Sequence, residues 1–243
     1  MKTLSRFITV SILLCGVALG HDIEKKNVTI DTVEQNQSVQ VLNEIPKKLR
    51  RKILGSTAKV TNPDGSHGTG TYMSYKSTNF ILTAAHVVRG FDTTFVSLDG
   101  VTLVPARVIY IDDKKDISIL IPEAGLESSP IKFKRHLSPE PGESLVYAGF
   151  PGWHDVLMFT GVVAGTERWE ENRIIMHSYA WKGCSGSVVF DHSGRVVGVL
   201  IAIDHMRMPA HPHPSGRIVE DIVWIEPVNI LTDEKLSAIF SNI

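Results

Sequence analysis

The sequence predicts an all-β protein, and two observations support this. From Ile53 onward, short apolar runs alternate with turn residues, and only the last stretch of the chain has helical spacing. Many short strands at such spacing are typical of β-barrels and β-sandwiches. With 243 residues, of which 43% are hydrophobic, the chain can bury one large core or two small ones.

The predicted strands fall into two groups of about six, separated by a Pro- and Glu-rich connection around Ser138–Glu143. The first group comprises Ile53–Val60, Gly68–Met73, Phe80–Thr83, Thr94–Leu98, Val104–Ile111 and Ile117–Ile121. The second group comprises Leu145–Ala148, Leu157–Val163, Ile174–Ser178, Ser187–Phe190, Val196–Ile203 and Ile222–Ile225. A short helix is expected within residues 231–243, where Thr232 is placed to cap the first turn and three apolar residues share one face.

Residues 1–20 have the pattern of a secretory signal peptide. Lys2 and Arg6 accompany the apolar run Phe7–Leu19, and Ala18-Leu19-Gly20 places small residues where a signal peptidase cleaves. The apolar run is short for a transmembrane helix, and retention as a membrane anchor is the alternative interpretation. We therefore expect an exported protein, secreted or periplasmic, with no stable membrane insertion after the signal is removed.

Three further expectations concern the mature chain. Cleavage after Gly20 removes Cys15, so Cys184 is the remaining cysteine and no intramolecular disulfide can form. Residues 21–52 carry few apolar side chains and are interpreted as a linker or pro-segment that ends in the basic cluster Lys47–Lys52. The formal net charge of -1 provides no basic excess to neutralise phosphates, which argues against nucleic-acid binding.

Three residues with modest individual signals occur in an order that acyl-transfer chemistry uses. Ser185 lies between two glycines directly before an apolar strand, a pattern that is also common in structural turns. His86 closes a strand after small residues, where a lone histidine is usually structural. Asp116 opens the strand Ile117–Ile121, and an acid there is either a turn residue or the partner of a base. Together they supply a base, an orienting acid and a nucleophile.

On these residues the chain resembles the trypsin-like, chymotrypsin-fold serine peptidases, in particular their bacterial branch without disulfides. The resemblance spans about Ile53–Val228 and rests on Thr83-Ala84-Ala85-His86, Asp116-Ile117-Ser118-Ile119-Leu120 and Gly183-Cys184-Ser185-Gly186-Ser187. It implies a peptidase domain at 53–230 made of two antiparallel six-stranded β-barrels, about 53–125 and 140–230, followed by a C-terminal helix at 231–243. The active cleft would lie between the barrels.

The resemblance also implies roles for the site residues. Ser185 would attack a peptide carbonyl, His86 would take and return the proton, and Asp116 would orient the imidazole. The backbone N–H groups of Gly183 and Ser185 would form the oxyanion hole. The implied function is an exported serine endopeptidase that needs no cofactor and no metal and acts on a protein or peptide substrate.

The specificity pocket is less well defined by the sequence. By position, the pocket for the residue before the scissile bond involves residues near Tyr179–Lys182, Leu200–Ala202 and Val223–Ile225, and the candidate substrate-binding residues among them are Tyr179, Ala180, Leu200 and Ala202. No aspartate falls there to bind a basic side chain, so small or medium apolar side chains are expected. Cys184 stands where many animal members carry an aspartate that pairs with a new N-terminus. Activation by that ion pair is therefore not expected, and Cys184 is interpreted as a small buried apolar residue.

Two other interpretations remain open. A catalytically silent protein of the same fold could bind peptide or copper, and the segment His205–His213 contains histidines and methionines, which suit copper. An esterase-like hydrolase could use the same three residues, because ester and peptide hydrolysis are both acyl transfers. An intact His86, Asp116 and Ser185 counts against the silent protein.

Overall fold

The computed structural model describes residues 45–167, 172–203 and 222–241. Three predicted features lie outside the described residues. They are the signal peptide, most of the linker at 21–52, and the segment His205–His213, whose histidines and methionines suit copper. Within the described ranges, none of the helices combines the length and the apolar character that crossing a membrane requires.

The first barrel contains six strands in antiparallel pairs. These are β1 (Thr57–Thr61), β2 (His67–Tyr75), β3 (Thr78–Thr83), β4 (Thr93–Ser97), β5 (Val104–Asp112) and β6 (Ile117–Pro122). Their order is β1-β4-β5-β6-β3-β2, and pairing of β1 with β2 closes the ring. A short additional strand, β7 (Ile131–Lys132), pairs in parallel with β2 on the outside of this ring.

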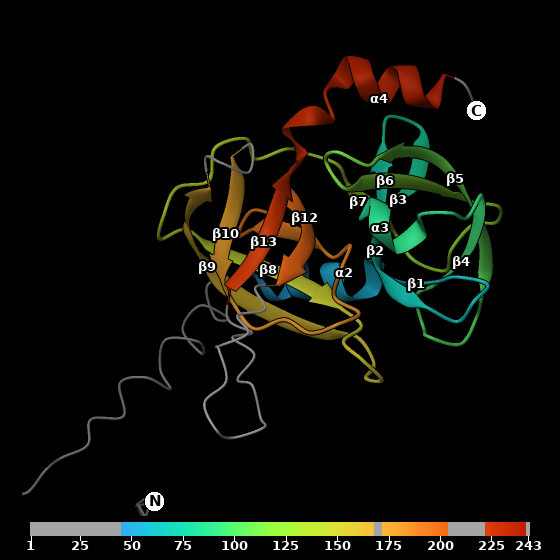
Figure 1. Cartoon of the computed structure of the whole chain (residues 1–243), viewed down its shortest axis with the longest axis horizontal. Helices are drawn as coiled ribbons and strands as arrows, with labels where there is room; N and C mark the ends of the chain where they lie inside the picture. The colour runs from blue at the N-terminus through green and yellow to red at the C-terminus, as the bar shows by residue number, and fades with distance from the viewer. Residues whose placement is uncertain (1–44, 168–171, 204–221, 242–243) are drawn as a thin grey trace, which may run out of the picture. The chain divides into compact units, whose positions relative to one another are not determined.

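The second barrel also contains six antiparallel strands, and it lies beside the first (Figure 1). Its strands are β8 (Ser144–Gly149), β9 (Leu157–Glu167), β10 (Arg173–His177), β11 (Val188–Asp191), β12 (Val196–Ile203) and β13 (Ile222–Pro227). They form a closed ring in the order β10-β13-β12-β11-β8-β9. The predicted fold class, two antiparallel six-stranded β-barrels with a short C-terminal helix, is confirmed.

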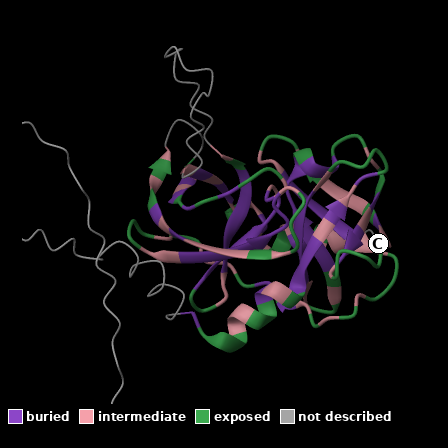
Figure 2. Ribbon diagram, turned by 90° about the horizontal axis from the view of Figure 1, so that it is seen from below, coloured by how far each residue is buried: buried purple, intermediate pink, exposed green. Residues whose placement is uncertain are grey.

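Strand β8 shows why the two barrels form one body. Leu145 and Tyr147 pack in the core of the second barrel, whereas Val146 and Ala148 belong to a larger core shared with the first barrel. Side chains alternate across a strand, so β8 is apolar on both faces and buried on both. Figure 2 shows the buried strands inside and the exposed residues on the turns and helices. Strand β8 therefore contributes side chains to both cores.

The helices differ from the sequence prediction in two places. The strand expected from Ile53 begins only at Thr57, and the residues before it form helix α2 (Lys47–Ser56). In α2, Leu49 and Ile53 are four residues apart and point inward, so the basic cluster is the exposed face of a helix rather than part of a linker. Ile45 is also buried, so the folded region includes residues before Ile53.

Three shorter helical segments follow strands of the barrels. Helix α3 (Ala85–Val88), which the apolar pattern did not predict, directly follows β3. After β13 comes a single 3-10 turn, η2 (Val228–Ile230), and then the expected C-terminal helix α4 (Asp233–Phe240). The side chain of Thr232 accepts a hydrogen bond from the N–H of Lys235, which confirms Thr232 as the N-cap.

Candidate active site

His86 and Asp116, which are thirty positions apart in sequence, are in direct contact. His86 lies in α3, and Asp116 is the last residue of the turn between β5 and β6. His86 Nδ1 is 2.6 Å from Asp116 Oδ2, and the backbone N–H of His86 donates to Asp116 Oδ1 at 2.7 Å. The N–H of Ala85 also donates to the Asp116 carbonyl oxygen at 3.1 Å. Asp116 thus fixes both the ring and the backbone of the histidine.

The surroundings favour an ionised Asp116. Partial burial by itself would raise its pKa, but the hydrogen bonds and charge of His86, with a smaller contribution from Arg89, lower the pKa below the ordinary value. The His86 side chain is 36% exposed and that of Asp116 is 16% exposed, so the imidazole faces the solvent and the carboxylate stands behind it. Asp116 has a φ of 51°, in the left-handed region, so its backbone conformation depends on its neighbours.

Ser185 lies in a tight turn, Gly183–Gly186, which we call the Ser185 turn. Thr69 on β2 holds this turn from the first barrel. The N–H of Thr69 donates to the Ser185 carbonyl oxygen at 2.8 Å, and Thr69 Oγ1 donates to the Gly183 carbonyl oxygen at 2.7 Å. Thr69 Oγ1 also accepts from the N–H of Phe150 at 3.0 Å. One threonine of the first barrel therefore fixes the turn that carries the serine.

Gly186 brings the Ser185 turn against the segment that leads to His86. Its φ is 89°, and a Cβ at this position would collide with the Thr69 carbonyl oxygen and with Thr83 Oγ1. It would also lie 3.0 Å from the backbone nitrogen of Ala84, two residues before His86. Only glycine permits this approach, because much of the obstacle is backbone that cannot move aside. The Ser185 turn thus packs against the backbone two residues before His86, and the direct contact among the three predicted catalytic residues is that between His86 and Asp116.

The backbone N–H groups of Gly183 and Ser185 are oriented by hydrogen bonds to the carbonyl oxygens of the residues before them. The carbonyl oxygen of Lys182 accepts from the N–H of Gly152 at 2.7 Å, and the carbonyl oxygen of Cys184 accepts from the N–H of Ser187 at 3.0 Å. In a planar trans peptide the carbonyl and the N–H point in opposite directions. The N–H groups of Gly183 and Ser185 therefore point away from these contacts, and neither donates a hydrogen bond within the described part of the chain.

A pocket of about 240 Å³ adjoins Ser185. Leu200 and Ala202, two of the four predicted pocket residues, line it together with Trp181, Lys182, Ile201 and Ile203. Tyr179 and Ala180 do not line this pocket. Ala180 is fully buried in the core of the second barrel, and the carbonyl oxygen of Tyr179 accepts a hydrogen bond from the Tyr147 hydroxyl.

Sequence reasoning missed Thr69 and one further residue of the site, His67. A Cβ at Gly183 would lie 3.0 Å from His67 Nε2, which is buried without a hydrogen-bond partner in the described residues. Burial and the charge of Lys59 lower the pKa of His67, which keeps this imidazole neutral. No local motif marks these residues, because their roles arise from contacts between distant segments.

Cys184, beside the serine, is buried as predicted. Burial raises the pKa of its thiol to about 11, so it is protonated at neutral pH. A thiol in this state is a poor nucleophile, and its side chain packs in the core of the second barrel. The buried, protonated thiol of Cys184 is therefore poorly suited to act as a nucleophile.

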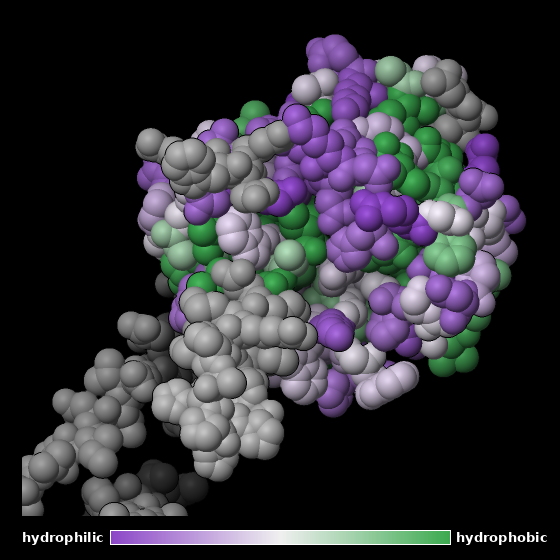
Figure 3. Space-filling view, viewed as in Figure 1, coloured by the Kyte–Doolittle hydropathy of each residue, from purple (hydrophilic) through white to green (hydrophobic). Residues whose placement is uncertain are grey.

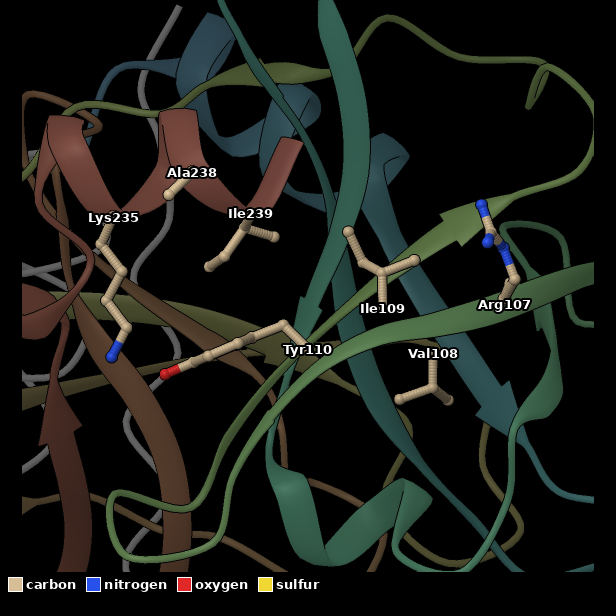
Figure 4. Close-up of a pocket in the computed structure, with 7 residues that line it drawn as sticks. All are labelled: Arg107, Val108, Ile109, Tyr110, Lys235, Ala238 and Ile239. Atoms are coloured by element: carbon tan, nitrogen blue, oxygen red, sulfur yellow. The ribbon is translucent and has the colours of Figure 1, made fainter. Parts of the chain in front are cut away.

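A larger pocket, of about 490 Å³, lies away from the triad residues. It is formed between β5 and α4 and is lined by Arg107, Val108, Ile109, Tyr110, Lys235, Ala238 and Ile239 (Figure 4). On the face drawn in Figure 3, hydrophobic surface lies beside the C-terminal helix. None of the predicted catalytic residues lines this pocket.

Among the described residues, His136, Glu143 and Asp191 are the group with suitable spacing for a metal ion. His136 Nε2 is 3.2 Å from Glu143 Oε2, and His136 Nδ1 is 3.6 Å from Asp191 Oδ2. The same Asp191 oxygen lies 2.6 Å from Arg195 Nε, so a guanidinium already compensates its charge. The contacts among these side chains form a partly buried ion-pair cluster.

Comparison with known proteins agrees with this geometry. The trypsin-like peptidase domain family matches residues 68–199. A Hahella chejuensis protein named "Probable periplasmic serine endoprotease DegP-like" is 28% identical over 162 residues, which cover 65% of this chain and 34% of that protein. "Protease Do-like 1, chloroplastic" of Arabidopsis thaliana is 28% identical over 148 residues, which cover 56% of this chain and 33% of that protein. The chain thus spans about a third of the length of these relatives.

A solved structure, the serine endoprotease from Yersinia pestis, shares the fold. Its TM-score is 0.63 at 18% sequence identity, and the match covers 80% of this chain and 66% of that chain. The region matched by the family contains His86, Asp116 and Ser185 and makes up more than half of the chain. The chain therefore belongs to the trypsin-like peptidase domain family.

Proposed function

We propose that this protein is a serine endopeptidase in which Ser185 is the nucleophile, His86 the general base and acid, and Asp116 the orienting acid. The observation that carries the proposal is the 2.6 Å contact between His86 Nδ1 and Asp116 Oδ2, with the Ser185 turn packed against the backbone that leads to His86. With Nδ1–H donating to the carboxylate, the other ring nitrogen carries the lone pair that can accept a proton.

The chemistry proceeds in two acyl transfers. Ser185 Oγ attacks the substrate carbonyl carbon while His86 Nε2 takes the hydroxyl proton, and Asp116 stabilises the imidazolium. His86 then gives the proton to the leaving amine as the C–N bond breaks, which leaves an acyl-enzyme. Water attacks the ester carbonyl, His86 accepts its proton and returns it to Ser185 Oγ, and the carboxylic acid product leaves.

The oxyanion formed in both steps would be held by the N–H groups of Gly183 and Ser185. Support comes from the hydrogen bonds that the carbonyl oxygens of Lys182 and Cys184 accept. In these two peptides the N–H groups of Gly183 and Ser185 point the opposite way, away from those contacts. Each such donor typically contributes about 3 kcal/mol of transition-state stabilisation. Thr69 would keep the Gly183 donor in place through its bond to the Gly183 carbonyl oxygen.

The pocket beside Ser185 would bind the residue before the scissile bond. Its walls are the apolar side chains of Leu200 to Ile203 and the ring of Trp181, which is 40% exposed. Lys182 at the rim is the charged residue among those that line the pocket. We infer a preference for apolar side chains, because none of the described residues that line the pocket carries an acidic group to pair with a basic side chain.

Export is a further part of the proposal. The signal-like pattern of residues 1–20 supports export, and the Hahella chejuensis relative is named as a periplasmic protein. The test is cell fractionation followed by N-terminal sequencing of the mature protein. Cleavage after Gly20 is expected, whereas a cytosolic protein with residue 2 intact would contradict export.

The enzymatic proposal is tested by cleavage of unfolded casein with mass-spectrometric mapping of the new termini. The full chain is expected to cut after apolar residues, and both Ser185→Ala and His86→Ala should lose the activity. Ser193→Ala, a change at an exposed serine in the turn after β11, serves as the control and should cleave normally. Hydrolysis of p-nitrophenyl esters without any peptide cleavage would contradict an endopeptidase and support an esterase-like hydrolase.

A further inference from the structure

We propose that Glu226 is a positioning residue for the active site. From the second barrel it holds Lys115 of the first barrel and thereby fixes the backbone of Asp116, against which His86 is oriented. The inference rests on the proposed function, because that function assigns Asp116 the role of orienting His86.

Glu226 is a buried carboxylate between two cations. It lies on β13 and is 1% exposed. Its Oε2 is 3.0 Å from Arg173 Nε on β10 of the same barrel, and its Oε1 is 3.4 Å from Lys115 Nζ of the first barrel. A buried charge needs compensation by opposite charge. Glu226 therefore forms an electrostatic bridge between the barrels.

The two oxygens of Glu226 are held differently. Oε2 accepts a hydrogen bond from Arg173, whereas Oε1 is buried without a hydrogen-bond partner among the described residues. The ammonium group of Lys115 supplies compensating charge to this second oxygen at ion-pair distance. Leaving a buried carboxylate oxygen uncompensated is costly, so the Lys115 side chain, which is 19% exposed, is drawn inward.

Lys115 immediately precedes Asp116, whose backbone is in the left-handed region. The N–H of Lys115 donates to Asp112 Oδ1 at 3.0 Å, so its backbone is held from one side. Asp112 Oδ2 in turn accepts from the Tyr110 hydroxyl at 2.9 Å and lies 3.5 Å from Lys235 Nζ of α4. Figure 4 shows the side chains of Lys235 and Tyr110 converging at one end of the pocket between α4 and β5.

The turn that ends in Asp116 is therefore fixed from outside the first barrel at two points. Helix α4 holds the backbone of Lys115 through Asp112, and Glu226 of the second barrel holds its side chain. A non-glycine residue with positive φ persists only where the surroundings impose it. Without the Glu226 charge, we expect Asp116 to relax and its 2.6 Å contact with His86 to loosen.

This role predicts a change in the proton NMR signal of His86 Nδ1–H, which a purely structural ion pair would leave unaltered. A short hydrogen bond to a carboxylate moves such a proton signal downfield, so loosening the 2.6 Å contact should move the signal upfield. The other charges near this pair are Arg89 and Asp113, which form an exposed ion pair at 2.8 Å beside it.

The test is the proton NMR signal of His86 Nδ1–H, recorded at one pH in the full chain and in its variants. Glu226→Gln and Lys115→Met should each move the signal upfield, and Lys115→Arg, which keeps the charge, should retain the wild-type position. The double variant Glu226→Gln with Lys115→Met should move it no further than either single variant, because both remove one interaction. Asp113→Asn is the control, since its ion pair is exposed and should matter little.

Fluorophosphonate labelling of the same samples separates this inference from the proposed function. The rate of labelling should fall by about tenfold or more in Lys115→Met, because small displacements of catalytic groups slow reactions strongly. Equal positions of the Nδ1–H signal in wild type and in folded Lys115→Met would overturn the role of Glu226. A shifted signal in a protein that no probe labels would support the positioning role and contradict the proposed function.

Discussion

At the residue scale, the site depends on contacts between segments that are far apart in sequence. Thr69 and Gly183 are separated by 114 positions, yet their hydrogen bond fixes the Ser185 turn. Sequence reasoning could select His86, Asp116 and Ser185, because each is marked by small residues or a strand boundary beside it. It could not select Thr69, because nothing near Thr69 in the chain reveals what its hydroxyl contacts.

The role of Thr69 leads to a first prediction. Thr69→Val removes both the donor to the Gly183 carbonyl oxygen and the acceptor for the Phe150 N–H. We expect labelling of Ser185 to slow by about 10- to 100-fold, because one oxyanion donor loses its fixed position. Thr94→Val is the matched control, since Thr94 is a buried threonine that bonds Thr61 and Asn62. An equal loss of labelling in both variants would indicate a general loss of packing.

Asp116 gives a pH-dependent prediction. Its pKa in the folded protein lies below the ordinary 3.8, so ionised Asp116 stabilises the fold above that pH. The stabilisation is lost as the pH falls through the folded pKa. The difference in free energy of unfolding between wild type and Asp116→Asn should therefore be largest above about pH 5 and shrink below it. Urea unfolding at a series of pH values measures it, and a difference that grows toward low pH would contradict this assignment.

At the element scale, strands were easier to predict than helices. Alternating or continuous apolar runs bounded by turn residues located the strands of both barrels. This works because a buried strand carries apolar side chains within its own short segment. Helix α2 was missed because its inward face is defined by few residues, chiefly Leu49 and Ile53, among five basic ones. Helix α3 is a single turn, too short for any periodicity.

The C-terminal helix provides the prediction at this scale. Thr232 caps α4 by accepting the Lys235 N–H at 3.2 Å. Thr232→Ala should lower the free energy of unfolding by about 1 kcal/mol, because it leaves an N-terminal N–H of the helix without its acceptor. Ser241→Ala, at the other end of the helix, is the control. Equal stability of Thr232→Ala and wild type in urea unfolding would show that the cap contributes nothing.

At the scale of the whole molecule, two barrels without disulfides are held together by a shared apolar core. Both faces of β8 are buried, one in the shared core and the other in the core of the second barrel. This explains why Val146 and Ala148 on one face and Leu145 and Tyr147 on the other are all apolar. The sequence indicated barrels or sandwiches, and only the resemblance to a family distinguished between them. Strand order and closure depend on pairings such as β1 with β2, which no local pattern encodes.

The buried thiol of Cys184 reports on the opening of the second barrel. Its raised pKa and its burial both slow reaction with alkylating reagents. In a Cys15→Ser variant, iodoacetamide at neutral pH should modify the protein slowly when it is folded and rapidly in denaturant, and a reductant should leave its Tm unchanged. Rapid modification of the folded protein would contradict a closed second barrel around Cys184.

The most direct test of the account is the labelling of Ser185 by a fluorophosphonate probe, with mass spectrometry to locate the modified residue. The account predicts one probe per folded molecule, attached to Ser185 Oγ, with labelling abolished in Ser185→Ala and strongly slowed in His86→Ala. A folded wild-type protein that stays unlabelled, or that carries the probe at another residue, would contradict the assignment of Ser185 as an activated nucleophile.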